Sequence, residues 1–207
     1  MQKPDSLHHG WVLPAKETLF TVASGITLVR TLIAVTFAVL AILHDNQWLL
    51  LAGLASYWVG DILDGIVARA LHQEMRSGAV LDIMADRLCV SLIYLTYGYM
   101  HPDMMWAIGI YLVEFMFIDG FLSLAFLFWP LLSPNYFFLV DRHIFKLNWS
   151  PAGKVVNSSL FLLATVFIGS PILSASIAIV VTGLKLYSLR RLYTQVIPNV
   201  SLKPGAR

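Results

Sequence analysis

Hydrophobic residues occur along this chain in six long runs that polar positions interrupt only sparsely. The runs cover residues 21–43, 47–70, 78–100, 104–130, 152–170 and 172–192. A helix needs about 20 mostly apolar residues to cross the hydrocarbon core of a bilayer. Because backbone polar groups in lipid must be paired within the segment, each run predicts a membrane-spanning helix. We therefore expect an all-α integral membrane protein, with 1–207 forming a single domain of six transmembrane helices.

The connections between the runs predict how the helices are arranged. Those near 44–47, 101–103 and 169–171 hold only a few residues, so the helices they join should be antiparallel neighbours. The connection 131–151 is longer and could form an interfacial helix. The segment 1–20 mixes large apolar residues with lysine and glutamate, which fits either a short interfacial helix or a polar leader.

Composition and charge support the membrane assignment and give an orientation. The chain is 58% hydrophobic and 13% charged, whereas a soluble domain carries about a quarter charged residues. A net charge of +2, without a basic run interleaved with aromatics, argues against a nucleic-acid partner. The three short connections contain none of the 14 lysines and arginines. Because these residues are retained in the cytoplasm, both termini are expected to be cytoplasmic.

Four aspartates stand at helical spacings on two neighbouring runs. Asp61 and Asp64 lie on one face of the second run, and Asp82 and Asp86 on one face of the third. The connection 70–77 is short, so the two faces should meet at one end of the bundle. Carboxylates at membrane depth cost about 2.5–3.5 kcal/mol each on insertion scales. A hard divalent cation such as Mg²⁺ would offset that cost and leave positions for a phosphate.

Small and basic residues accompany the aspartates. Gly65 and Gly78 leave the helix surface bare, so that a nucleotide can approach the backbone. The planar guanidinium group of Arg69 can donate two parallel hydrogen bonds to a phosphate. The alternative is that the aspartates are structural and pair with Arg69, Arg76 and Arg87. Their shared helical register favours the metal site.

The complete pattern resembles the signature of the CDP-alcohol phosphotransferases. That signature is Asp-x2-Asp-Gly-x2-Ala-Arg-x8-Gly-x3-Asp-x3-Asp, and every fixed position is present here. The resemblance, nearest to bacterial phosphatidylglycerophosphate and cardiolipin synthases, implies a homodimeric enzyme of phospholipid biosynthesis in a bacterial plasma membrane. Such an enzyme uses Mg²⁺ or Mn²⁺ to transfer a substituted phosphate from a CDP-linked donor to an alcohol, with release of CMP.

The resemblance also assigns roles to residues, with the active site on the cytoplasmic side. It places the metal at the four aspartates Asp61, Asp64, Asp82 and Asp86. It places the CDP donor at Asp61, Gly65, Ala68, Arg69 and Gly78. Asp86 would also be the catalytic base that deprotonates the acceptor hydroxyl.

In length and number of spans the chain resembles the small bacterial members of the family, and this resemblance implies CDP-diacylglycerol as the donor. The stretch Thr27-Leu28-Val29-Arg30 resembles a motif of phosphatidylglycerophosphate synthases, which favours glycerol 3-phosphate or phosphatidylglycerol as acceptor. Inositol phosphate, serine or another alcohol are the alternatives. The expected acceptor pocket is cationic and consists of Arg30, Lys154, Arg190 and Arg191.

Two acids in the fourth run do not fit a simple phosphate acceptor. Glu114 and Asp119 stand where phosphate-accepting relatives usually carry basic residues. They are expected either to pair with Arg30 or Arg87, or to bind a polyol or an ammonium group. Intramembrane charges also occur in transporters, and an inactive scaffold is a further alternative. The absence of a sequence repeat argues against a transporter, and the intact signature argues against an inactive scaffold.

Overall fold

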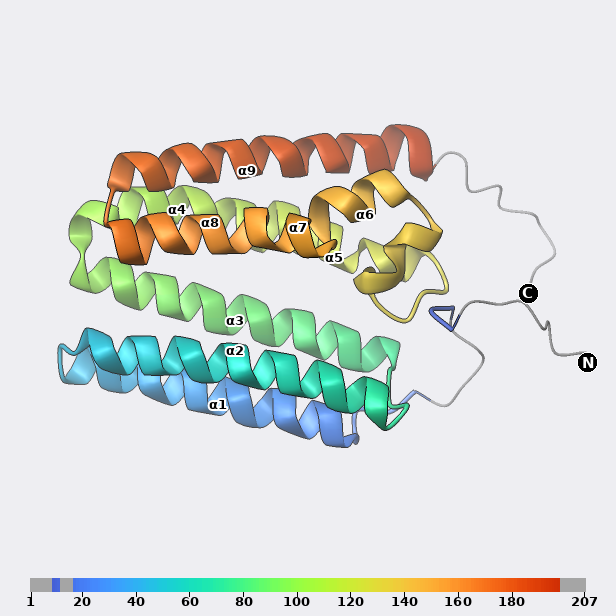
Figure 1. The fold of residues 1–207 in the computed structure, drawn as a ribbon, viewed down its shortest axis with the longest axis horizontal. Helices are drawn as coiled ribbons and strands as arrows, with labels where there is room; N and C mark the ends of the chain where they lie inside the picture. The colour runs from blue at the N-terminus through green and yellow to red at the C-terminus, as the bar shows by residue number, and fades with distance from the viewer. Residues whose placement is uncertain (1–8, 12–16, 198–207) are drawn as a thin grey trace, which may run out of the picture.

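The computed structural model describes residues 9–11 and 17–197, and this part of the chain is helical with no strand (Figure 1). Each segment of the chain that runs the length of the bundle is called a passage. The first three passages are single helices, α1 (Val22–Leu43), α2 (Gln47–Ala70) and α3 (Arg76–Met100). The fourth passage consists of η1 (Pro102–Met104), α4 (Met105–Val113), the π-helix η2 (Glu114–Asp119), α5 (Gly120–Leu124) and η3 (Ala125–Phe128). The fifth consists of α7 (Pro151–Lys154), η5 (Val155–Ser159), α8 (Leu160–Leu162) and η6 (Leu163–Ile168). The sixth consists of α9 (Pro171–Arg191) and η7 (Leu192–Val196).

These passages confirm the predicted all-α membrane fold, and their ends lie within a few residues of the predicted ones. Five of them are long and apolar enough to cross a membrane by length and composition. The exception among the described passages is α3, which has 25 residues but carries the charged residues Asp82, Asp86 and Arg87. These charges lower its mean hydropathy, although its length matches that of its neighbours.

Small residues allow α1 and α2 to pack closely. Ala34, Ala38 and Ala41 of α1 are buried. On α2, a Cβ placed at Gly53 would lie 2.8 Å from the Cβ of Phe37, so only glycine fits without a shift. Packing through small residues is the usual way in which membrane helices approach each other. Figure 1 shows this pair on one side of α3, with the remaining passages on the other.

The connection between the fourth and fifth passages lies at the same end of the bundle as the start of α3 (Figure 1). It forms two short helices, η4 (Pro134–Leu139) and α6 (Arg142–Asn148), instead of the single interfacial helix that the sequence suggested. Asp141 caps α6 by accepting hydrogen bonds from the backbone nitrogens of His143 and Ile144, both at 2.8 Å.

Asp141 also ties this connection to the last transmembrane helix. Its Oδ2 lies 2.9 Å from Nη2 of Arg191. Burial alone would raise the pKa of Asp141, but the hydrogen bond from Arg191 and the capping bonds lower the pKa overall. The carboxylate therefore stays charged at neutral pH, and it holds α6 against the end of α9.

The predicted N-terminal segment 1–20 lies partly outside the described residues, which omit 1–8 and 12–16. Trp11 forms an isolated antiparallel bridge with Leu131. Glu17 accepts hydrogen bonds from the backbone nitrogen of Ser77 at 3.1 Å and from its hydroxyl at 2.8 Å. Burial would raise the pKa of Glu17, but these bonds lower the pKa overall. Because the residue before α3 provides no side-chain cap, Glu17 serves as one.

Candidate active site

The aspartate faces of α2 and α3 meet at one end of the bundle. Asp61, Asp64 and Asp82 each offer a carboxylate oxygen, and these oxygens all lie within 4.8 Å of one another. Asp64 is buried, while the side chain of Asp61 is 42% exposed. Helical spacing within α2 and the short turn to α3 thus bring together carboxylates from two helices.

Arg30 lies in the middle of this carboxylate group, and its side chain is only 2% exposed. Its guanidinium contacts all four aspartates, with the nearest nitrogen 2.9 Å from Asp64, 3.0 Å from Asp86 and 3.4 Å from Asp61, and a further bond to Asp82. It therefore supplies the positive charge that buried carboxylates require.

Two neighbours determine the position of Arg30. A Cβ at Gly60 would collide with the Cβ of Arg30. The absence of a side chain at Gly60 therefore leaves room on α2 for the side chain of Arg30. Thr27, one turn before Arg30 on α1, donates a hydrogen bond of 2.7 Å to Asp64 Oδ2. Thr27 and Arg30 therefore both hold the buried carboxylate from the same face of α1. Gly60 was not among the predicted site residues, because its packing role depends on a residue 30 positions away.

The carboxylate group fits a divalent cation. Its donors are hard oxygen atoms from three side chains, the set that Mg²⁺ and Mn²⁺ prefer. Arg30 brings one positive charge to four carboxylates, so most of the negative charge is still unbalanced. Asp61, Asp64 and Asp82 would hold the ion, whereas Asp86 lies outside this group of three.

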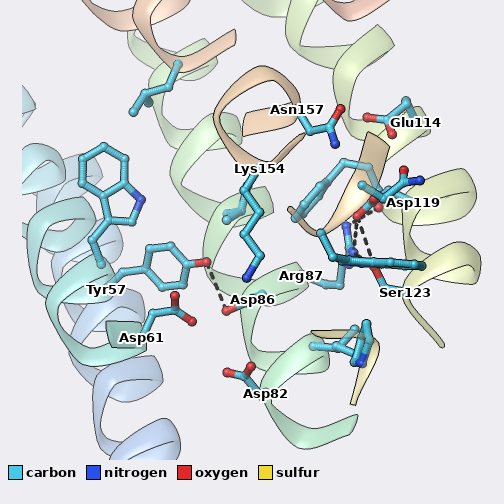
Figure 2. A pocket seen from close by; sticks show the side chains of 18 of the residues that line it. Tyr57, Asp61, Asp82, Asp86, Arg87, Glu114, Asp119, Ser123, Lys154 and Asn157 are labelled. Atoms are coloured by element: carbon cyan, nitrogen blue, oxygen red, sulfur yellow. Dashed lines mark hydrogen bonds and ion pairs between the residues drawn. The ribbon is translucent and has the colours of Figure 1, made fainter. Parts of the chain in front are cut away.

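Asp86 is instead held by a tyrosine of the neighbouring helix. The hydroxyl of Tyr57 donates a hydrogen bond of 3.0 Å to Asp86 Oδ1 (Figure 2), and Arg30 donates to the same oxygen. The guanidinium of Arg30 also lies 5.1 Å from the centre of the Tyr57 ring. Among the described residues both hydrogen bonds go to Oδ1, so Oδ2 can accept another donor.

Two cavities adjoin at these aspartates. The larger, of about 310 Å³, is lined on one side by Asp61, Asp82 and Asp86. The smaller, of about 100 Å³, is lined by Asp64, by Ser24 and Thr27 of α1, and by the predicted donor residues Gly65, Ala68, Arg69 and Gly78. Ala79, Asp82, Ser133 and Asn135 border both cavities. A ligand can therefore extend from the smaller cavity to the aspartates without leaving the protein surface.

The far side of the larger cavity carries a second polar cluster. Asp119 accepts hydrogen bonds from Arg87 and from Lys185, and Arg87 also donates to Ser123 Oγ at 3.0 Å. The sequence left open whether Glu114 and Asp119 pair with Arg30 or Arg87 or bind a polyol or an ammonium group, and Arg87 is the partner of Asp119. Lys185 was not among the predicted site residues, although a lone lysine within an apolar run is a signal for a buried partner.

Of the residues expected to bind the acceptor, Lys154 lines the larger cavity. Its amine points into the cavity (Figure 2) and lies 3.2 Å from Asn135 Oδ1. Arg30, Arg190 and Arg191 are described but line neither of the two cavities. Arg30 lies among the aspartates, and Arg191 pairs with Asp141 at the end of α9.

Comparison with known proteins gives one result. A family model described as CDP-alcohol phosphatidyltransferase matches residues 20–189. This stretch covers most of the chain and contains both aspartate pairs and the second polar cluster. No curated protein and no solved structure matches significantly.

Proposed function

The chain belongs to the CDP-alcohol phosphatidyltransferase family, and we propose that it transfers a phosphatidyl group from CDP-diacylglycerol to an alcohol, releasing CMP. The observation that carries this proposal is the pair of cavities that adjoin at a cluster of aspartates. One cavity suits a nucleotide and the other suits a second substrate, with the acids between them. This arrangement matches a reaction in which one group passes directly between two bound molecules.

The smaller cavity would hold the CDP part of the donor. Gly65, Ala68 and Gly78 present little side chain to it, and a Cβ placed at Gly78 would meet no heavy atom closer than 4.0 Å. Arg69 lines the same cavity and can bind a phosphate through its planar fork. The diphosphate would then lie toward Asp82, which borders both cavities. The acyl chains of the donor would remain in the surrounding lipid.

Besides the metal, the transfer needs a proton acceptor and correct positioning of the two substrates. When bound at Asp61, Asp64 and Asp82, Mg²⁺ or Mn²⁺ would neutralise charge on the diphosphate and on the leaving CMP. Asp86 takes the proton of the acceptor hydroxyl, and Tyr57 keeps that carboxylate in place. The hydroxyl oxygen bonds to the phosphorus that carries diacylglycerol, while the bond from that phosphorus to the CMP oxygen breaks. A direct displacement inverts the configuration at phosphorus.

We also propose the orientation and assembly that the resemblance implies. The site would face the cytoplasm of a bacterial plasma membrane, with both termini on that side, and the protein would act as a homodimer. The distribution of lysine and arginine supports this orientation, since the short connections at the other end of the bundle contain neither. A cytoplasmic site also has access to a nucleotide-linked donor.

Asp61→Ala is expected to weaken Mg²⁺-dependent binding of CDP by at least about tenfold, since the variant removes a metal ligand. Isothermal titration of CDP, with Mg²⁺ and with EDTA, measures the effect. Asp61 is the suitable position because its side chain is partly exposed, so its removal disturbs the packing little. Asp103→Ala, at an exposed position in a short connection, is the matched control. If Asp61→Ala keeps the wild-type dependence on Mg²⁺, the proposed metal site is wrong.

A further inference from the structure

The wall of the larger cavity that faces the aspartates carries two acids and two bases. Figure 2 shows Glu114, Asp119 and Arg87 on this side, across the cavity from Tyr57 and Asp61. Lys185 of α9 lines the same cavity. The wall is therefore formally neutral. An acceptor bound between it and Asp86 would have its reacting hydroxyl at the aspartate and its other end at this wall.

Both bases of the wall pair with the same acid. Asp119 accepts from Arg87 and from Lys185, and Arg87 also donates to the carbonyl oxygen of Phe115 and to Ser123 Oγ. A phosphate group carries almost two negative charges and binds through cations that can donate to it. Arg87 and Lys185 keep further N–H donors, and Arg87 Nε has no hydrogen-bond partner among the described residues, but Glu114 and Asp119 already balance their two positive charges. A phosphate would add almost two negative charges beside these two acids, and like charges at such close range in a buried site repel strongly.

The unpaired carboxylate oxygen of Glu114 indicates that a ligand with a hydrogen-bond donor binds at this wall. The residue is 2% exposed and lines the cavity, and among the described residues its Oε1 has no hydrogen-bond partner. A buried carboxylate oxygen without a donor is costly, so a bound ligand is expected to supply one. The donor could be a hydroxyl or an ammonium group. An ammonium group would add a third positive charge beside Arg87 and Lys185, whereas a hydroxyl leaves the wall neutral.

The local backbone turns both acids toward the cavity. Glu114 and Asp119 are the first and last residues of the π-helix η2. Hydrogen bonds from residue i to i+5 widen the turn, so residues five apart come close to a common face. Single π turns of this kind occur frequently at functional sites. The wall therefore depends on a local departure from the α-helix.

We propose that this wall binds an uncharged polyol end of the acceptor, whose hydroxyls donate to Glu114 and which carries no phosphate and no ammonium group there. The inference rests on the proposed function, because it names the acceptor class of that same transfer. The polyol could be a free sugar alcohol or the glycerol end of a lipid headgroup. Of the two acceptors that the sequence favours, this chemistry retains phosphatidylglycerol and disfavours glycerol 3-phosphate.

Matched acceptor pairs test the inference on the full-length protein in detergent with Mg²⁺ and CDP-diacylglycerol. The pairs are glycerol with glycerol 3-phosphate and inositol with inositol 1-phosphate, with serine added as an amine. Phosphatidylglycerol in mixed micelles forms a separate arm, which distinguishes a lipid headgroup from a free polyol. We expect kcat/KM for an uncharged polyol or for phosphatidylglycerol to exceed that for every phosphorylated or amine acceptor at least tenfold.

The outcomes separate the acceptor class from the transfer itself. Preferred use of glycerol 3-phosphate, inositol 1-phosphate or serine would overturn the inference and leave the proposed function intact. If no acceptor releases CMP, the transfer is contradicted, and the inference that rests on it fails as well.

Variants of Glu114 provide the second readout. Glu114→Ala should raise KM for the preferred acceptor at least tenfold, and Glu114→Gln, which keeps the shape and a carbonyl acceptor, should raise it less. Glu114→Lys should shift the preference toward the phosphorylated member of a pair. The CDP affinity of each variant reports whether it has folded. A well-folded Glu114→Ala variant with wild-type KM would show that Glu114 does not bind the acceptor.

Discussion

Asp86→Asn is expected to lower turnover by about 10²–10⁴-fold, the usual contribution of a general base, while CDP binding with Mg²⁺ changes little. The amide cannot take the proton of the acceptor hydroxyl. It can still accept the hydrogen bond that Tyr57 donates to Asp86 Oδ1, so the geometry of the site should persist. Steady-state CMP release gives the turnover, and isothermal titration gives the CDP affinity.

The control for this variant is Asp103→Asn, which makes the same chemical change at an exposed position in a short connection. Its turnover should equal that of the wild type. Asp86 also lies next to the three carboxylates that could hold a metal, so the CDP titration is repeated over a range of Mg²⁺ concentrations. Loss of turnover with an unchanged Mg²⁺ dependence supports the base. Near wild-type turnover in purified Asp86→Asn would mean that another group takes the proton.

Arg30→Gln is expected to destabilise the protein far more in EDTA than in Mg²⁺. The buried guanidinium contacts all four aspartates, and removing one partner from a buried ionic group costs about 3–5 kcal/mol. In Mg²⁺ a bound cation supplies positive charge to the same carboxylates, so part of that loss should be recovered. Thermal unfolding in detergent, followed in both conditions at one scan rate, measures the difference.

Arg191→Gln is the matched control for this effect. Arg191 is also paired, but with the single acid Asp141, which lies in the connection before α6 and outside the aspartate cluster. Its loss of thermal stability should be small and equal in EDTA and in Mg²⁺. If Arg30→Gln also loses equal stability in both conditions, then Arg30 and a metal ion do not share the carboxylates.

The fold and the aspartate cluster could be predicted because both depend on local patterns. The lengths of the apolar runs set the passages, and spacings of three and four residues placed the carboxylates of α2 and α3 on faces that meet. The two short helices in the connection before α7 also had signals in the sequence. Pro134 stands at the start of η4, and Asp141 is a good N-cap for α6.

The position of Arg30 could not be predicted in the same way. Its route to the aspartates depends on the missing side chain of Gly60 on another helix. The common orientation of Glu114 and Asp119 was hidden as well, since five residues of α-helix would turn them to different faces. Lys185 was visible as a charge in an apolar run, but its partner lies 66 positions earlier. These features depend on packing between helices, which a local pattern does not encode.

Metal-dependent release of CMP from CDP-diacylglycerol by the purified protein tests the central claim most directly. The assay supplies Mg²⁺, the panel of alcohol acceptors and an EDTA control. The account predicts CMP release that requires both the metal and one acceptor, with the phosphatidyl group recovered on that acceptor. No release with any acceptor, from folded protein that binds CDP, would contradict the proposed transfer.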